Sequence, residues 1–414
     1  MTRGAAALAV GTLIWSLAAP AASADEIRDQ QWALKSFEAE TKVWPVSQGE
    51  GIVVAVIDSG VSQDHQDLTG QVLPGADFSG AGTDGRVDRD GHGTAMASLI
   101  AGHGHGSQVG IIGLAPKSKI LPVKVRGTGE NPDPDLHDVA DAIRFATDHS
   151  AKVINLSLGG PYQYDKEIRR AVAYAGSKDV VVVASTGNET EPRVAYPAAF
   201  PGVVAVGAVG STGAVWERSN TGPETTLVAP GVEIYHASAK STTGYAIGDG
   251  TSDSTAYVSA TAALIRSKYP NLSAGQVINR MITTASKPAD GSKVPSDRYG
   301  YGLVSPAKAL EANPAVDNGT RDNPLVGRPE SQGSPDDYPT AVPDRASPDR
   351  NADDVLAVVI VAAGVLLVLA VPVLVVLLLL RARRRRRQAA AEAAAAAARA
   401  AYAAAYPYGP PPPR

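Results

Sequence analysis

Short runs of apolar, mostly β-branched residues alternate along the middle of the chain with longer stretches of helical pattern. The apolar runs predict strands at 52–57, 119–125, 153–158, 180–185 and 203–208. The longer stretches predict helices at 93–101, 135–149, 164–177, 254–268 and 273–283. Nearly continuous apolar runs are typical of strands buried on both faces of a parallel sheet. The alternation therefore predicts an α/β fold with a doubly wound parallel sheet flanked by helices.

The first 24 residues have the pattern of a signal peptide. Arg3 precedes an apolar run, and the small residues Ala22-Ser23-Ala24 form an A-x-A site, so we expect cleavage before Asp25. The alternative is an uncleaved anchor, but the apolar run is short for a membrane span. Residues 25–48 are then an N-terminal extension ahead of the main domain.

The other end of the chain predicts a membrane anchor. Residues 355–380 carry no charge and are rich in Val and Leu. As a helix they exceed the roughly 30 Å hydrocarbon core of a bilayer, so they predict one C-terminal transmembrane helix. An arginine-rich stretch follows, and the positive-inside rule then keeps residues 381–414 in the cytoplasm. Residues 314–354, rich in Pro, Asp, Gly and Ser, predict a disordered stalk. The globular domain is therefore expected at 49–313, on the extracellular side of the plasma membrane.

Composition excludes several classes of function. The net charge is −4 at pH 7, which gives no support for the basic face that nucleic-acid binding usually needs. The chain has no cysteine. Disulfides, thiolate metal sites and a cysteine nucleophile are therefore all excluded.

Three polar residues lie at the ends of strands or at glycine turns. Asp58 follows the first predicted strand, at the carboxyl edge where function collects in such sheets. His92 opens a predicted helix between two glycines, which allow other groups to approach it closely. Ser252 follows a glycine turn and precedes a long apolar helix, whose N-terminus favours a developing oxyanion. Singly, each has an ordinary alternative: a turn aspartate, a structural histidine and a helix-capping serine.

Together the three residues and their flanking motifs are far more specific. Their order, Asp then His then Ser, is the order of subtilisin among the convergent serine-protease triads. The motifs Asp58-Ser59-Gly60, His92-Gly93-Thr94 and Gly250-Thr251-Ser252 resemble those of the subtilisin-like, or subtilase, family. Further matches are His65-Gln66-Asp67-Leu68, Ser157-Leu158-Gly159-Gly160, Ser185-Thr186-Gly187-Asn188 and Ala229-Pro230-Gly231. The resemblance covers residues 49–313.

A narrower resemblance involves both ends of the chain. The start Ile27-Arg28-Asp29-Gln30-Gln31-Trp32, together with the C-terminal span, is similar to the mycosins, the subtilases associated with type VII secretion in actinobacteria. In that family the N-terminal segment wraps the catalytic domain and is not a bulky inhibitory propeptide. The resemblance implies three partners: a protein or peptide substrate, the plasma membrane and the type VII secretion membrane complex.

The resemblance also implies roles for individual residues. Asp58, His92 and Ser252 would be the catalytic triad of a serine endopeptidase. The carboxamide of Asn188 and the backbone N–H of Ser252 would bind the oxyanion. An extended peptide would pair with the backbone of the substrate-binding residues Ser157, Leu158, Gly159 and Gly160. The reaction needs no cofactor. Family members often bind structural calcium, and the sequence identifies no ligands for it.

Other residues compete for roles or depart from the family pattern. His65 is a second candidate base, but we expect it on a surface loop. His103 and His105 suggest a metal site, although a polar glycine-rich loop is the simpler interpretation without a carboxylate at ligand spacing. The family usually has Met or Phe directly after the nucleophile, where this chain has Asp253. Because a negative charge near the oxyanion would oppose the chemistry, we expect Asp253 to point away from the pocket.

Three functions are compatible with these features. The first is a surface endopeptidase that acts in type VII secretion. The second is a mainly structural stabiliser of the secretion membrane complex with weak catalysis. The third is a general cell-surface protease unrelated to secretion.

Overall fold

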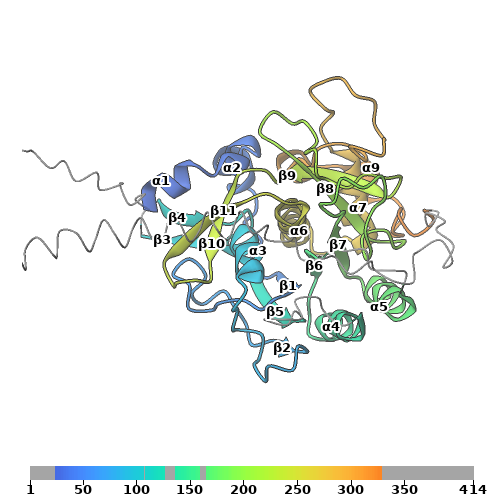
Figure 1. Cartoon of the computed structure of the whole chain (residues 1–414). Helices are drawn as coiled ribbons and strands as arrows, with labels where there is room; N and C mark the ends of the chain where they lie inside the picture. Colours follow the sequence, from blue (N-terminus) through green and yellow to red (C-terminus); the bar gives the residue numbers. More distant parts are fainter. Residues whose placement is uncertain (1–23, 107, 126–135, 159–164, 329–414) are drawn as a thin grey trace, which may run out of the picture. The chain divides into compact units, whose positions relative to one another are not determined.

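A seven-stranded parallel sheet lies at the centre of the described domain (Figure 1). The structure is a computed structural model, and it describes residues 24–106, 108–125, 136–158 and 165–328. In spatial order the strands are β2 (Ala76–Asp77), β5 (Lys119–Lys124), β1 (Val53–Asp58), β6 (Val153–Leu156), β7 (Val181–Ser185), β8 (Val204–Val209) and β9 (Thr225–Pro230). Every neighbouring pair is parallel. The five predicted strands are confirmed, with ends shifted by one or two residues.

Helices cover both faces of this sheet (Figure 1). Because side chains alternate along a strand, Val54 and Val56 of β1 face one helical layer, whereas Ala55 and Ile57 face the other. The helical elements are α1 (Ala24–Asp29), α2 (Trp32–Ser36), the π-helix η1 (Ala39–Val43), α3 (His92–Ala101), α4 (Leu136–Asp148), α5 (Lys166–Ser177), α6 (Thr251–Lys268), α7 (Ala274–Thr283), α8 (Pro306–Ala309) and α9 (Pro314–Asp317). Helices α3, α6 and α7 share the first layer, and α4 and α5 form the second. The α/β fold with a parallel sheet flanked by helices is therefore confirmed.

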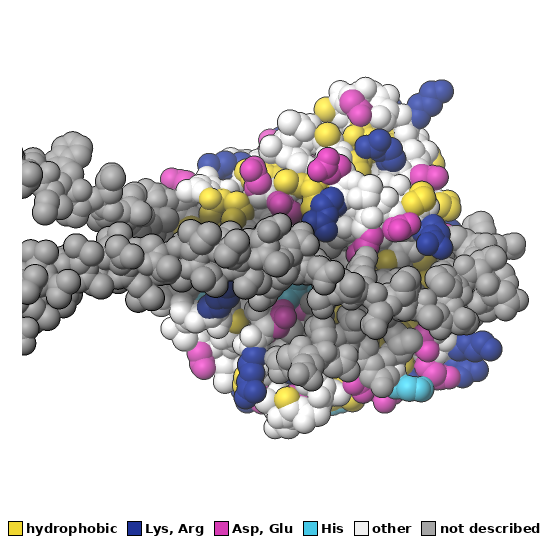
Figure 2. All heavy atoms as spheres, in the orientation of Figure 1, with side chains coloured by type: hydrophobic (Ala, Val, Ile, Leu, Met, Phe, Trp, Pro, Cys, Tyr) yellow, Lys and Arg dark blue, Asp and Glu magenta, His cyan; other side chains and the backbone are white. Residues whose placement is uncertain are grey.

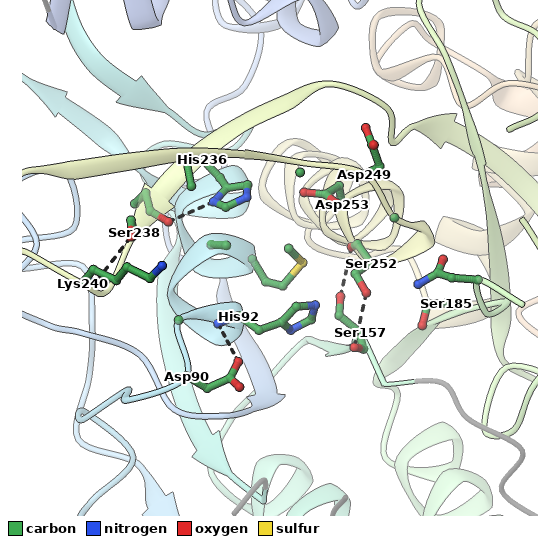
Figure 3. A pocket seen from close by; sticks show the side chains of 18 of the residues that line it. Asp90, His92, Ser157, Ser185, His236, Ser238, Lys240, Asp249, Ser252 and Asp253 are labelled. Atoms are coloured by element: carbon green, nitrogen blue, oxygen red, sulfur yellow. Dashed lines mark hydrogen bonds between the residues drawn. The ribbon is translucent and has the colours of Figure 1, made fainter. Parts of the chain in front are cut away.

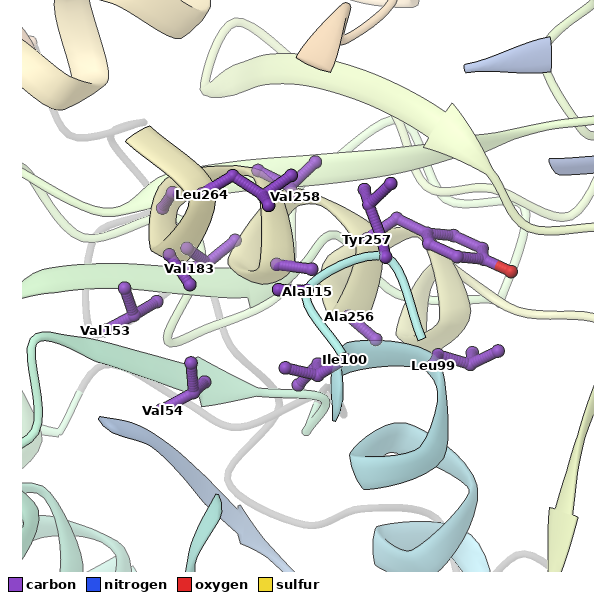
Figure 4. Close-up of a cluster of buried hydrophobic side chains, with 14 of the residues drawn as sticks. Val54, Leu99, Ile100, Ala115, Val153, Val183, Ala256, Tyr257, Val258 and Leu264 are labelled. Atoms are coloured by element: carbon purple, nitrogen blue, oxygen red, sulfur yellow. The ribbon is translucent and has the colours of Figure 1, made fainter. Parts of the chain in front are cut away.

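Helix α6 is buried on all sides over most of its length. Figure 4 shows Ala256, Val258 and Leu264 of this helix in one cluster with Leu99 of α3 and the sheet residues Val54, Val153 and Val183. A helix without a polar face can be stable only inside a core, and its many Ala, Ser and Thr residues allow close packing. It begins at Thr251, earlier than the predicted start at 254, so Ser252 lies in its first turn.

The pattern of apolar residues failed to predict several strands. Two are β2 and β9, at the edges of the large sheet. The others form two antiparallel hairpins, β3 (His103–His105) with β4 (Val109–Ile112) and β10 (Ile234–Ser238) with β11 (Gly244–Gly248). The two hairpins are rich in Gly, His, Ser and Tyr, and most residues of β11 are half-buried, so they lack the apolar run used for prediction.

The N-terminal extension packs against the main domain. Gln31 makes two bonds to the backbone of β4, since its side-chain N–H donates to the Ile112 carbonyl and its oxygen accepts from the Ile112 N–H. The Trp32 indole donates to the Val232 carbonyl at 3.1 Å. The Phe37 ring is buried edge-on against Tyr257 of α6, with centroids 5.4 Å apart. Residues 27–48 are therefore part of the domain's core and not a separate module.

The packed chain continues beyond residue 313. The fully buried Arg280 of α7 forms a two-point ion pair with Asp317 of α9, at 2.8 and 2.7 Å, and Leu325 is also buried. Arg328 donates to the carbonyl of Phe200. The sequence predicts a stalk from 314, so this boundary is too early. Its composition is polar, but the segment is held by the buried Arg280 and the half-buried Arg328 and not by a large apolar face.

The predicted membrane segments cannot be compared with the fold. Within the described ranges, no helix is long and apolar enough to cross a bilayer. The predicted span at 355–380 lies outside those ranges, as do residues 1–23 of the signal peptide, the stalk from 329 and the tail at 381–414. On the face seen in Figure 2, acidic and basic side chains are interspersed wherever the described surface is visible.

We predict that Phe37→Ala destabilises the protein by about 3–5 kcal/mol, because it leaves a cavity against Tyr257 and removes a ring contact. Denaturant unfolding followed by tryptophan fluorescence measures the change. Glu40→Ala, at an exposed position of the same segment, is the control and should stay within about 0.5 kcal/mol. Equal stability of both variants would show that the extension contributes nothing to the core.

Candidate active site

A cavity of about 480 Å³ opens where the carboxyl ends of the central strands meet the start of α6 (Figure 3). Strand β1 has β5 on one side and β6 on the other, so the chain order reverses beside it. Ligands bind at such switch points in doubly wound sheets. The residues that line the cavity include His92, Ser157, Asn188 and Ser252, which come from four separate segments.

Asp58 and His92 meet at the end of β1. Both carboxylate oxygens of Asp58 lie 2.9 Å from His92 Nδ1, and Asp58 is completely buried. The ring of His92 is about a quarter exposed and faces the cavity. Gly93 allows this approach, because a side chain there would lie 2.1 Å from the Gly60 carbonyl oxygen. The glycine after the histidine is therefore needed to dock α3 against β1.

Asp88 organises the loop that leads into α3, and sequence reasoning missed it. Its buried carboxylate accepts from the hydroxyl of Ser59 and from the backbone of Gly91 and Thr94. The Ser59 hydroxyl in turn accepts from the Gly93 N–H. Burial raises the pKa of Asp88, against the opposing effect of these hydrogen bonds. In the sequence, only its position four residues before His92 could have indicated a role near the site.

Ser252 and Asn188 lie at the N-terminus of α6. The Ser252 hydroxyl points into the cavity and makes a long contact of 3.5 Å with the Ser157 carbonyl. The side-chain oxygen of Asn188 accepts from the backbone N–H and the hydroxyl of Thr251, at 3.0 and 2.9 Å. Because both donors bind the amide oxygen, the orientation of the Asn188 carboxamide is fixed and its NH2 group is the end left for another acceptor.

The predicted substrate-binding residues are described only in part. Ser157 lines the cavity and donates from its hydroxyl to the Ser252 carbonyl at 3.0 Å. Leu158 is buried, and its carbonyl accepts from the Ser185 hydroxyl. Gly159 and Gly160 lie outside the described residues.

Asp253 lines the cavity, so the expectation that it points away is wrong. It is 4% exposed, and its Oδ1 has no hydrogen-bond partner among the described residues. Burial raises the pKa of Asp253 to about 7, although attraction by His92 opposes the shift. The prediction failed because the whole first turn of α6 is buried, so position 253 has no solvent-facing direction.

The hairpin β10–β11 forms one wall of the cavity, which sequence reasoning also missed. His236 lies on this wall together with Ala246 and Gly248 (Figure 3). Burial and the neighbouring His92 lower the pKa of His236, although its hydrogen bond to Ala237 opposes this. The cavity around Ser252 is therefore lined by Ser157 and Ser185 as well as by the β10–β11 hairpin.

His65 and His105 make local contacts away from the cavity. His65 was expected on the surface, but it is fully buried, and its Nε2 lies 2.9 Å from the Gly244 carbonyl. His105 contacts the buried Asp67 at 2.6 Å. Across the described ranges, no group of three or more His, Asp or Glu side chains is placed to hold a metal ion.

Comparison with known proteins agrees with this architecture. The model of the subtilase family matches residues 49–302. Subtilisin DY of Bacillus licheniformis is 35% identical over 268 residues, which are 64% of this chain and 92% of that protein.

Two solved structures that resemble the domain are proteases of type VII secretion systems. The MycP3 protease from the type VII (ESX-3) secretion system is 33% identical, with a TM-score of 0.59 over 69% of this chain and 88% of that one. The serine protease MycP1, described as an essential component of the type VII (ESX-1) secretion system, is 32% identical, with a TM-score of 0.61 over 69% and 89%. The chain therefore belongs to the subtilase family of serine proteases, and its structural neighbours are the mycosins of type VII secretion systems.

Proposed function

We propose that the protein is a membrane-anchored extracellular serine endopeptidase that acts in type VII secretion, with Asp58, His92 and Ser252 as its triad. The observation that carries the proposal is the meeting of buried Asp58 with His92 Nδ1 at 2.9 Å, on the wall of the cavity that also holds Ser252. These residues belong to three elements far apart in the sequence, β1, α3 and α6. Only the tertiary fold brings them to one place.

Each member has a role that its surroundings support. Asp58 accepts the Nδ1 proton of His92, which leaves the lone pair on Nε2 to take the proton of Ser252 as it attacks the scissile carbonyl. His92 then returns this proton to the leaving amine. Asp58 stabilises the imidazolium that forms in between, and its burial makes this interaction stronger than it would be in water.

The oxyanion would be bound from two directions. The Asn188 carboxamide, held by Thr251 through its oxygen, presents its NH2 group. The backbone N–H of Ser252 belongs to the first turn of α6, where N–H groups have no helical acceptor and the helix dipole favours negative charge.

Two observations outside the site support the proposed membrane anchor and the proposed role in secretion. The uncharged stretch 355–380 and the arginines after it are the basis for a single-pass anchor with the domain outside. The likeness to MycP1 and MycP3, both described as proteins of type VII secretion systems, supports a role in that process. A mainly structural role is the second candidate, because the MycP1 neighbour is described as an essential component of its system.

We predict that a fluorophosphonate probe labels the wild-type protein at Ser252 and not the Ser252→Ala variant. Asn188→Ala should still fold but lose about 100- to 1,000-fold in turnover, the loss typical of removing one oxyanion donor, as in subtilisin. Mass spectrometry of the labelled peptide and initial rates on a peptide substrate measure the two effects. A wild-type protein that remains unlabelled would contradict the proposed chemistry.

A strain that carries Ser252→Ala should distinguish the two candidate roles. If the function is proteolytic, this strain should lose processing of secreted proteins while the variant accumulates to normal levels. Immunoblots of culture filtrate and cell fractions measure both. Normal processing and secretion in this strain, with secretion lost on deletion of the gene, would favour the structural role.

The titration of Asp253 should make stability depend on pH. The folded-state pKa of about 7 lies above the ordinary value of 3.8, so the folded state keeps a proton that the unfolded chain loses. The contribution of this group to the free energy of unfolding is therefore greatest below about pH 4. It decreases by up to about 4 kcal/mol as the pH rises from there through 7. We predict that Asp253→Asn raises Tm at pH 8 and has little effect at pH 4. Thermal unfolding at both values measures this, and an equal shift at both would contradict it.

A further inference from the structure

One carboxylate oxygen of Asp253, Oδ1, is buried without a hydrogen-bond partner beside Ser252. Oδ1 makes no hydrogen bond within the described part of the chain, and the side chain lines the cavity directly after Ser252. In Figure 3 it extends from the start of α6 toward His236. An isolated buried carboxylate is costly unless a cation or a set of donors compensates it. The structure therefore points to a ligand group that supplies this compensation.

The groups around Asp253 do not supply it. Asp249, also on the cavity wall, accepts from the Glu233 N–H and adds negative charge. His236 has a lowered pKa, so it is mainly neutral at pH 7. His92 attracts Asp253 but is already paired with Asp58. The other titratable groups that face it are Tyr257, on its own helix, and Asp90 and Lys240, which line the same cavity. Neither Lys240 nor any other base in the described chain forms an ion pair with it.

The position of Asp253 indicates which part of a substrate would meet it. In Figure 3, Ser157 and Ser185 lie on one side of Ser252, whereas Asp249, Asp253 and His236 lie on the other. Under the proposed function, the acyl part of the substrate lies along Ser157, with its carbonyl oxygen toward Asn188. The leaving-group part then lies along the wall that holds Asp253.

We propose that Asp253 is a specificity-determining residue that favours substrates with Lys or Arg as the first residue after the scissile bond. The inference rests on the proposed proteolytic function and deepens it. A long basic side chain can carry its charge across the cavity to the carboxylate while its aliphatic stem covers the wall. The cation neutralises Asp253, so it also removes a negative charge that would oppose the oxyanion.

Cleavage-site profiling tests the inference with the full-length protein. A peptide mixture is digested at pH 8 and at pH 5.5, and the new N-termini are identified by mass spectrometry. We expect Lys and Arg at new N-termini to be enriched about tenfold at pH 8, where Asp253 is charged, and about twofold or less at pH 5.5. Enrichment compares cleavage before basic residues with cleavage before other residues in the same digest. An effect of pH on His92 changes both rates equally and so does not alter this ratio.

Two variants separate the carboxylate from general electrostatics. Asp253→Asn removes the charge at nearly constant shape and should abolish the enrichment at pH 8. Glu233→Gln removes an exposed charge near the same wall and should retain it. If Asp253→Asn does not fold, the pH comparison on the wild-type protein still decides. Equal cleavage before neutral and basic residues at pH 8 would overturn the inference and leave the proposed function intact.

A binding measurement separates a failure of the proposed proteolytic function from a failure of the proposed role of Asp253. Absence of any hydrolysis by the wild-type protein would contradict the proposed function. In that case, peptides that differ only in Lys or Gln after the scissile position are titrated into Ser252→Ala by fluorescence anisotropy. Tighter binding of the Lys peptide by about fivefold or more, lost in the Ser252→Ala, Asp253→Asn double variant, would support the role of Asp253. Equal binding would overturn it.

Discussion

The burial of helix α6 is the constraint on which the rest of the structure depends. The helix has no polar face, so the sheet, α3 and the N-terminal extension must all pack around it. Its first turn therefore lies at one fixed place, because α6 packs against β6, β7 and α3. Ser252 is held there by its helix, and the donor groups of the helix N-terminus face the same space. Rigid placement of this kind gives a nucleophile its orientation.

The same burial has a cost that the structure does not remove. A residue directly after Ser252 is enclosed with it, whatever its charge, because the helix cannot rotate without disturbing the core. Asp253 is therefore a carboxylate in a place that disfavours charge. Under the inference drawn above, a basic residue of the substrate compensates this charge.

How far the sequence predicted the structure depended on the type of signal. The buried strands of the sheet were predicted because their apolar runs are continuous. Asp58, His92 and Ser252 could be named as candidates because their flanking motifs are short and local, and the structure places His92 and Ser252 on one cavity with Asp58 against His92. The hairpin β10–β11 was missed, since its half-buried residues have no clear period. Residues 314–328 were missed because the buried Arg280 and the half-buried Arg328 hold a polar segment. The orientation of Asp253 depends on packing between elements, which no local pattern encodes.

The N-terminal extension also has a consequence for the order of folding. Trp32 bonds to Val232, 200 positions later in the chain, and Phe37 packs on Tyr257. Gln31 finds its partner Ile112 earlier, but Trp32 and Phe37 gain theirs only after most of the domain has been synthesised. Contacts of such long sequence separation require closure of a large loop, which slows folding. The contacts of Trp32 and Phe37 thus join the two ends of the domain around α6.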